Sequence, residues 1–290
     1  MEAGPQYALD WPARQLLGRI MNFSNLIWIV FLFLALQPLI AAQWLRSLRS
    51  NKFAAIQKQR SSRIIAVIHR QEAMRFLGFP LARYIDMDDA EKVLYAIRTT
   101  PNATPIDLIL HTPGGLVIAA VQIARALRAH PAKVTVFVPH FAMSGGTLLA
   151  LAADEIVMSP HAVLGPIDPQ INGLPAASII KVAAEKPLSE IDDQTLILAD
   201  LGQKAIEQLK RQAGELIRAP MAHEAAVKLA EELTKGRWTH DYPISADEAR
   251  SLGLNVNTNM PDEILELLAL FPQPVRTTQS VEFGPGPVPQ

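Results

Sequence analysis

The segment HFAMSGGTLLALAADEIVMSPHAVLGPID, residues 140–168, decides the fold. An apolar, β-branched run at residues 133–139 leads into it, and an alanine-rich apolar run follows its serine and two glycines. The first run predicts a buried strand and the second a buried helix. Ser144 is therefore expected on a sharp corner between a strand and a helix, where a base would have to accept its proton.

The surrounding sequence repeats this alternation of strand and helix. Buried strands are predicted at residues 64–68, 106–110, 133–139 and 154–158. Amphipathic helices are predicted at residues 86–98, 117–130, 192–218 and 221–233. Strands that alternate with helices predict parallel βαβ units, and hence an α/β fold.

An uncharged segment precedes the α/β region. Residues 26–42 carry no charge, and a helix needs about 20 apolar residues to cross ~30 Å of hydrocarbon. Every charged residue from position 46 to 63 is basic, which favours the cytoplasmic side. A cleaved signal peptide and a buried core helix are the alternatives, although the sequence around Ala41 is a poor cleavage site. We expect a single-pass membrane protein with its main domain in the cytoplasm.

These patterns divide the chain into five parts. They are an N-terminal flank (residues 1–24), a transmembrane helix (25–45), a basic juxtamembrane linker (46–62), an α/β domain (63–270) and a disordered proline-rich tail (271–290). The lipid bilayer is thus an expected partner, and the basic linker is expected to touch its anionic headgroups.

Composition excludes several classes of function. The 290 residues carry a net charge of −1, which gives no indication of a nucleic-acid binder. Without cysteine there is neither a disulfide nor a thiolate nucleophile. No Gly-x-Gly-x-x-Gly motif follows a predicted strand, so no nucleotide site is expected. We expect neither a cofactor nor a metal.

Two predicted strands end in glycine pairs, at residues 111–115 (HTPGG) and 144–146 (SGG). The carboxyl ends of parallel strands lie at one edge of a sheet, where sites form. Glycine adopts positive φ and brings N–H groups close to a ligand. Each turn alone is most often only a tight turn. Together they predict backbone donors aimed at a developing oxyanion, with Ser144 as a nucleophile beside them.

Four segments resemble the Clp/crotonase superfamily: residues 109–116 (ILHTPGGL), 142–147 (AMSGGT), 152–154 (AAD) and 165–167 (GPI). The closing segment, residues 235–254, is also similar to that superfamily. In detail the chain resembles the serine dehydrogenase proteinases, and is similar to signal peptide peptidase A and the Clp proteolytic subunit. The similarity covers about residues 63–258.

The resemblance implies a Clp/crotonase-type ββα spiral with an N-terminal transmembrane helix. It implies that Ser144 is the nucleophile and that backbone N–H groups of Gly114 or Gly115, and of Gly145, form the oxyanion hole. It also implies a peptide or protein substrate and a homo-oligomer.

The resemblance leaves the base to be chosen. The histidine of Clp-type peptidases would fall near Ile167, which does not titrate, so a Clp-type Ser-His-Asp arrangement is not supported. In signal peptide peptidase A the base is the second lysine of an Ile-Lys-x-x-x-x-Lys segment, which matches residues 180–186 and implies Lys186, with Lys181 as the competing lysine. The reference pKa of about 10.4 would have to fall by several units through burial. The alternative for Lys186 is a solvated surface lysine.

Three further residues are auxiliary candidates. Asp168 lies close to the position of the Clp histidine and would orient the base or bind substrate, or else cap a turn. His111 opens the first glycine turn and would line the pocket. His240 is interpreted as structural or as part of a subunit contact.

The resulting hypothesis is a membrane-anchored serine endopeptidase with a Ser144–Lys186 dyad. The alternatives are a crotonase-type acyl-CoA enzyme, for which Asp168 is the nearby carboxylate, and a catalytically inactive peptide-binding scaffold. A serine-directed covalent probe separates the first from the other two.

Overall fold

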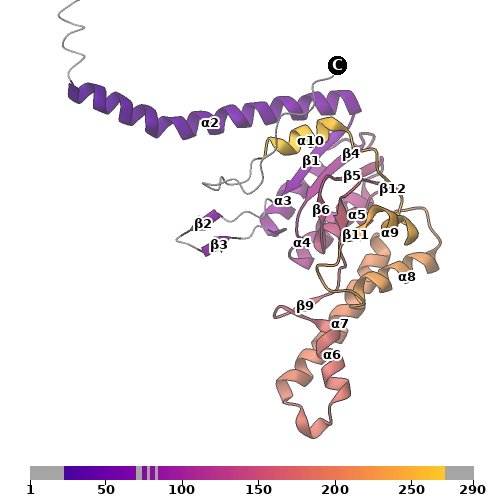
Figure 1. Ribbon diagram of the computed structural model, residues 1–290. Coiled ribbons are helices and arrows are strands. Elements are labelled where there is room, and N and C mark those ends of the chain that lie inside the picture. The colour runs from indigo at the N-terminus through magenta and orange to yellow at the C-terminus, as the bar shows by residue number, and fades with distance from the viewer. Residues whose placement is uncertain (1–22, 70–73, 77–78, 82–83, 272–290) are drawn as a thin grey trace, which may run out of the picture. The chain divides into compact units, whose positions relative to one another are not determined.

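The computed structural model describes residues 23–69, 74–76, 79–81 and 84–271 (Figure 1). The chain forms two compact units that divide after Lys52. The predicted flank at residues 1–24 and the predicted tail at 271–290 lie almost entirely outside the described residues.

Helix α2, Phe23–Arg60, runs without interruption through the predicted transmembrane segment and linker. Its part from Trp28 to Arg60 is long and apolar enough to cross a membrane, judged by length and composition. The mean hydropathy of its most apolar 18-residue stretch is 1.8, and none of that stretch is buried. Among the described residues it is the one such helix.

The second unit is an α/β domain built on a parallel sheet. The strands β1, β4, β5, β7 and β12 lie in that order and are Arg63–Ile68, Ile106–His111, Val134–Val138, Glu155–Met158 and Val256–Asn257. All neighbouring pairs are parallel, so their carboxyl ends lie at one edge of the sheet. The four predicted strands are confirmed, and β12 is an addition.

The sheet is buried on both faces because successive side chains alternate between two cores. Every residue of β4 is buried. Leu108 and Leu110 belong to the larger core, whereas Ile109 joins Phe137 and Ile56 in the smaller one. A strand covered on both sides needs the continuous apolar sequence that predicted it.

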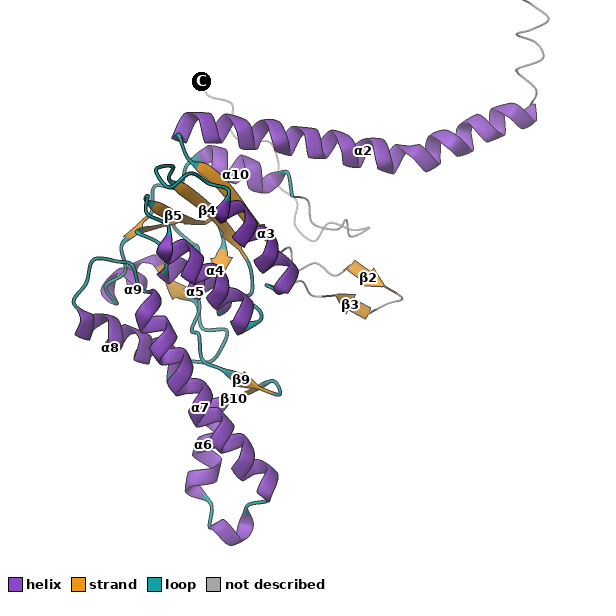
Figure 2. Cartoon of the chain, turned by 180° about the vertical axis from the view of Figure 1, so that it is seen from behind, coloured by secondary structure: helices purple, strands orange, loops and turns teal. Residues whose placement is uncertain are grey.

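Helices cover both faces of the sheet. Helices α3, α4 and α5 lie on the face of the larger core (Figure 2) and are Met87–Arg98, Val117–Ala129 and Gly145–Leu151. The last turns of α2 and helix α10, Asp262–Ala269, contribute to the smaller core on the other face. Helix α3 begins at Asp86 through a capping box with Asp89.

A second, three-stranded sheet positions the candidate site. Its order is β11-β8-β6, with strands Ile244–Ser245, Val163–Leu164 and Phe141–Ala142. Strands β6 and β8 are parallel, and β11 is antiparallel to β8. Ser144 follows β6, Asp168 follows β8 and His240 precedes β11, so all three emerge at the same end of this sheet.

Two helices form an arm of the α/β domain. Helix α6, Ala176–Glu185, is followed by the short 3₁₀ helix η1, Leu188–Glu190, and then by α7, Asp193–Leu216. Helices α6 and α7 pack together and project from the sheet and its covering helices (Figures 1 and 2). We call the segment from α6 to the start of α7 the arm.

The remaining elements are short or lie outside the sheets. The hairpin β9–β10, Gln170–Ile171 and Leu174–Pro175, leads into the arm. Helices α8, His223–Thr234, and α9, Ala246–Ser251, follow it, and the hairpin β2–β3, Met74–Phe76 and Phe79–Leu81, lies between β1 and α3.

Candidate active site

Ser144 occupies a strained corner between β6 and α5, as the sequence predicts. Its backbone angles are φ 49° and ψ −113°, a region that L-residues rarely occupy. Such a conformation costs of order 1–3 kcal/mol and persists only where its surroundings fix it. Here the Met143 N–H donates to the Thr112 carbonyl (3.0 Å), and the Gly146 N–H donates to the Met143 carbonyl (2.7 Å).

The Pro-Gly-Gly turn lies directly against this corner. A Cβ atom on Gly114 (φ 107°) would lie 2.7 Å from the Cβ atom of Ser144. A Cβ atom on Gly115 (φ 153°) would lie 2.2 Å from the carbonyl oxygen of Ile85. The turn is held on its other side by Ile85, whose N–H donates to the Gly114 carbonyl (2.7 Å). Only glycine allows these two approaches.

Backbone N–H groups of the two glycine turns lie near each other. The nitrogen of Gly115 lies 3.4 Å from where a Cβ atom of Gly145 would be. Among the described residues, no hydrogen bond joins the N–H of Gly115 or of Gly145 to a protein acceptor. The N–H of Gly114, in contrast, donates to the Thr112 hydroxyl oxygen (3.2 Å). Of the three predicted oxyanion-hole donors, the Gly114 N–H is therefore already hydrogen-bonded, whereas within the described chain those of Gly115 and Gly145 are not.

The two candidate lysines lie on the arm. Lys186 directly follows α6 and is exposed. Lys181 is also exposed and faces Glu185, with 3.8 Å between their charged atoms. Within the described part of the chain, no hydrogen bond joins either lysine to Ser144. The single chain thus brings Ser144 and the three glycines together, but does not bring the lysines to them.

Asp168 is buried and paired with a residue far away in the sequence. The His240 Nδ1 lies 2.8 Å from Asp168 Oδ1, and the Gln170 amide donates to Asp168 Oδ2 (2.6 Å). The hydrogen bond to the Asp168 carboxylate raises the pKa of His240, while burial of the imidazole acts in the opposite direction. The sequence offered no local pattern for this pair, because the partners are brought together by β8 and β11.

His111 is buried at the end of β4. Its ring packs against Phe141, with 4.4 Å between the centroids, and meets the ring of His140 edge-on at 5.5 Å. In residues 23–69, 74–76, 79–81 and 84–271, no group of three His, Cys, Asp or Glu side chains is placed to hold a metal ion.

A strained serine at the carboxyl edge of a parallel sheet, beside a second turn with available N–H groups, is typical of enzymes that form an acyl intermediate on serine. The chain belongs to the family of ClpP-like SDH-type serine proteinases, which residues 15–290 match. It is therefore a serine peptidase, as the sequence predicts, rather than an acyl-CoA enzyme.

Known proteins are similar to this chain over very different lengths. MJ0137 of Methanocaldococcus jannaschii, an uncharacterized protein, is 50% identical over 268 residues, which cover 92% of this chain and 94% of that protein. The probable protease SohB of Haemophilus influenzae is 37% identical over 81 residues, 27% of this chain and 23% of SohB. The solved structure of ClpP1 from Listeria monocytogenes has a TM-score of 0.45 and 17% identity, covering 72% of this chain and 99% of ClpP1.

Proposed function

We propose that this serine peptidase is a membrane-anchored endopeptidase in which the Ser144 hydroxyl attacks the carbonyl carbon of a peptide bond. The observation that carries the proposal is the strained Ser144 corner packed against the Pro-Gly-Gly turn. The backbone strain is held by hydrogen bonds from the neighbouring turn, which favours a functional role for this conformation.

The oxyanion of the acyl-transfer step is held, in this proposal, by the N–H groups of Gly115 and Gly145. Both groups lack a protein acceptor in the described chain and come from adjoining turns. The Gly114 N–H already donates to Thr112, so Gly114 contributes the close approach to Ser144 rather than a donor. Removal of one such donor from a serine peptidase costs about 10²–10³ in kcat.

Lys186 is the proposed base, and it is delivered from a neighbouring copy of the chain. An ammonium group has no lone pair, so the amine must be dry enough to stay neutral. The arm that carries Lys186 also exposes apolar side chains, Leu188 by 72% and Ile197 by 59%. An assembly that covered these side chains with the next subunit would bury Lys186 at the same time.

His240 is a second candidate base, favoured by one specific contact. Its Nδ1 faces the Asp168 carboxylate, which leaves Nε2 as the nitrogen available to a serine hydroxyl. Ser144, Asp168 and His240 also emerge at the same end of the β11-β8-β6 sheet. This arrangement would use the chain order Ser-Asp-His instead of the Clp order.

The substrate class follows from the site and the tether. Unfolded or membrane-derived polypeptides suit a peptidase held beside a bilayer, and an extended segment would pair beside the Pro-Gly-Gly turn. Helix α2 supplies the anchor through Trp28–Arg60. The basic residues at positions 46–63 favour the cytoplasmic side for the peptidase domain.

Hydrolysis of an unfolded protein substrate by the full-length protein in detergent tests the proposal. Ser144→Ala and Lys186→Ala are each expected to lower kcat by at least ~10³-fold. Lys181→Ala is the matched control, because it removes another exposed lysine from the same arm, and it is expected to keep near-normal turnover. Loss of activity in His240→Ala with full activity in Lys186→Ala would reassign the base to His240.

Mixing inactive subunits tests how the base is delivered. If Lys186 acts on the Ser144 of another copy, unfolding and co-refolding Ser144→Ala with Lys186→Ala restores part of the activity, because some subunit pairs contain both intact residues. No recovery from a mixture that reassembles normally would place the dyad within one chain.

A further inference from the structure

We propose that Thr112 and His69 are positioning residues, which hold the Pro-Gly-Gly turn so that the Gly115 N–H meets the oxyanion. This inference rests on the proposed function, because it concerns the same donors. It adds two residues that do not touch the reacting atoms.

Thr112 contacts both turns of the site. Its backbone N–H donates to the Phe141 carbonyl (3.2 Å), and its carbonyl accepts from the Met143 N–H (3.0 Å). A Cβ atom on Gly146 would lie 2.7 Å from the Thr112 methyl carbon. Its hydroxyl oxygen accepts the Gly114 N–H. Thr112 is fully buried, so its side chain joins the serine corner to the glycine turn.

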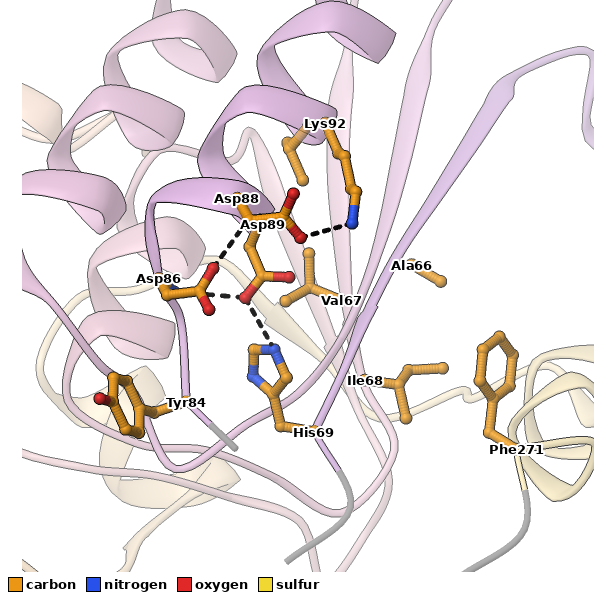
Figure 3. A pocket seen from close by; sticks show the side chains of 11 residues that line it. Ala66, Val67, Ile68, His69, Tyr84, Asp86, Asp88, Asp89, Lys92 and Phe271 are labelled. Carbon is orange, nitrogen blue, oxygen red and sulfur yellow. Dashed lines mark hydrogen bonds and ion pairs between the residues drawn. The ribbon is translucent and has the colours of Figure 1, made fainter. Parts of the chain in front are cut away.

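His69 fixes the orientation of this hydroxyl. It follows β1, and its ring lies between α3 and Thr112, with Nε2 3.0 Å from Asp89 Oδ2 (Figure 3) and Nδ1 2.8 Å from Thr112 Oγ1. A carboxylate only accepts, so Nε2 carries a hydrogen. In the tautomer that carries its one hydrogen on Nε2, Nδ1 accepts the Thr112 hydroxyl hydrogen. The Thr112 oxygen then keeps its lone pairs for the Gly114 N–H.

The orientation matters because the hydroxyl has a competing acceptor. The Gly114 carbonyl oxygen lies 3.3 Å from Thr112 Oγ1. Without His69, the Thr112 hydroxyl hydrogen can point toward the Gly114 carbonyl instead. The Pro-Gly-Gly turn then loses the fixed orientation of the hydroxyl that accepts the Gly114 N–H. If the Pro-Gly-Gly turn can rotate, the Gly115 N–H is no longer preorganised to stabilise the oxyanion of the transition state. Substrate binding would change little.

Asp89 anchors the network to α3. Its carboxylate also accepts the Asp86 N–H (3.2 Å) within the capping box. Asp88 and Lys92, the other charged residues of the 580 Å³ pocket in Figure 3, pair with each other. The Asp89–His69–Thr112–Gly114 series therefore links the start of a helix to the glycine turn through consecutive hydrogen bonds.

Thr112→Val tests the inference, since valine keeps the shape of threonine and removes the hydroxyl. In the full-length protein we expect kcat to fall about 10–100-fold with KM changed less than about twofold. The affinity for a peptide aldehyde, whose adduct with serine places an oxygen in the oxyanion hole, should fall in parallel. Thr112→Ser should restore kcat, and His69→Gln should lower it in the same direction.

Thr100→Val is the matched control. Thr100 is also buried, but its hydroxyl donates to the Ala96 carbonyl at the end of α3 (2.7 Å), so this variant should retain wild-type kcat. The inference is overturned if Thr112→Val keeps wild-type kcat, or if kcat falls without loss of aldehyde affinity. If Thr112→Val does not fold, an unchanged kcat in folded His69→Gln overturns it. A wild-type protein that hydrolyses no peptide would overturn the proposed function. An active wild type with an unaffected Thr112→Val variant would overturn this inference alone.

Discussion

At the scale of single residues, the site depends on positions where only one residue type fits. Gly114 and Gly115 allow backbone approaches that any Cβ atom would block, and Ser144 is held at positive φ by hydrogen bonds from the Thr112 turn. The geometry of the site thus begins with the backbone, and the Asp168–His240 pair adds a titratable contact at the same end of the β11-β8-β6 sheet.

The Asp168–His240 pair predicts a pH-dependent stability. Because the pKa of His240 is raised in the folded protein, the pair's contribution is complete below the unfolded pKa of about 6.5 and is lost as pH rises through the folded pKa. The urea midpoint of the wild type should therefore exceed that of His240→Gln by more at about pH 6 than at about pH 9. A difference that is the same at both pH values would contradict this.

Part of this residue-level picture was predictable. Paired glycines and a serine after apolar strands form a local pattern, so the sequence predicted the two turns that contain Gly114, Gly115, Ser144 and Gly145. Their catalytic roles stay a prediction. His69 was not predicted, because its two partners lie 20 and 43 residues away. The Asp168–His240 contact, across 72 residues, was missed for the same reason.

At the scale of elements, the length of each apolar pattern decides what the sequence predicts. Strands β1, β4, β5 and β7 are continuous apolar runs, and they were predicted within one or two residues. Strands β6, β8 and β11 have two residues each, which is too short to show a period. These short strands orient the site, so its framework could not be read from periodicity.

One ion pair joins the end of α2 to the sheet. The carboxylate of Asp107, whose side chain is 3% exposed, accepts from Arg60 Nε (2.5 Å) and Ser62 Oγ (2.6 Å). The guanidinium of Arg60 also lies over the Phe137 ring, 4.8 Å from its centroid. The pair holds the last turn of α2 against β4.

Asp107→Ala should lower the free energy of unfolding by about 3 kcal/mol, because it leaves a partly buried guanidinium without its carboxylate. Urea denaturation of the full-length protein in detergent measures this. Lys204→Ala is the control, since it breaks an exposed pair with Asp200 on α7, and exposed pairs contribute about 0–1 kcal/mol. Equal effects from the two variants would exclude a stabilising role for the α2–β4 contact.

At the scale of the whole molecule, the proposed nucleophile and the proposed base belong to different parts of the α/β domain. Ser144 lies at the edge of the sheets, while Lys186 follows α6 on the projecting arm and is exposed. The assignment of Lys186 came from resemblance to signal peptide peptidase A. Sequence spacing does not say whether Lys186 would act on Ser144 of its own chain or of another copy. Assembly is therefore part of the proposed mechanism.

Covalent labelling of the full-length protein with a fluorophosphonate, with the adduct mapped by mass spectrometry, tests most directly whether Ser144 is an activated nucleophile. We predict a single adduct on Ser144 of the wild type, none on Ser144→Ala, and labelling at least ~10²-fold slower in Lys186→Ala. Equal labelling of Ser144→Ala, or an unlabelled Ser144 in a wild-type preparation that hydrolyses peptides, would contradict the assignment.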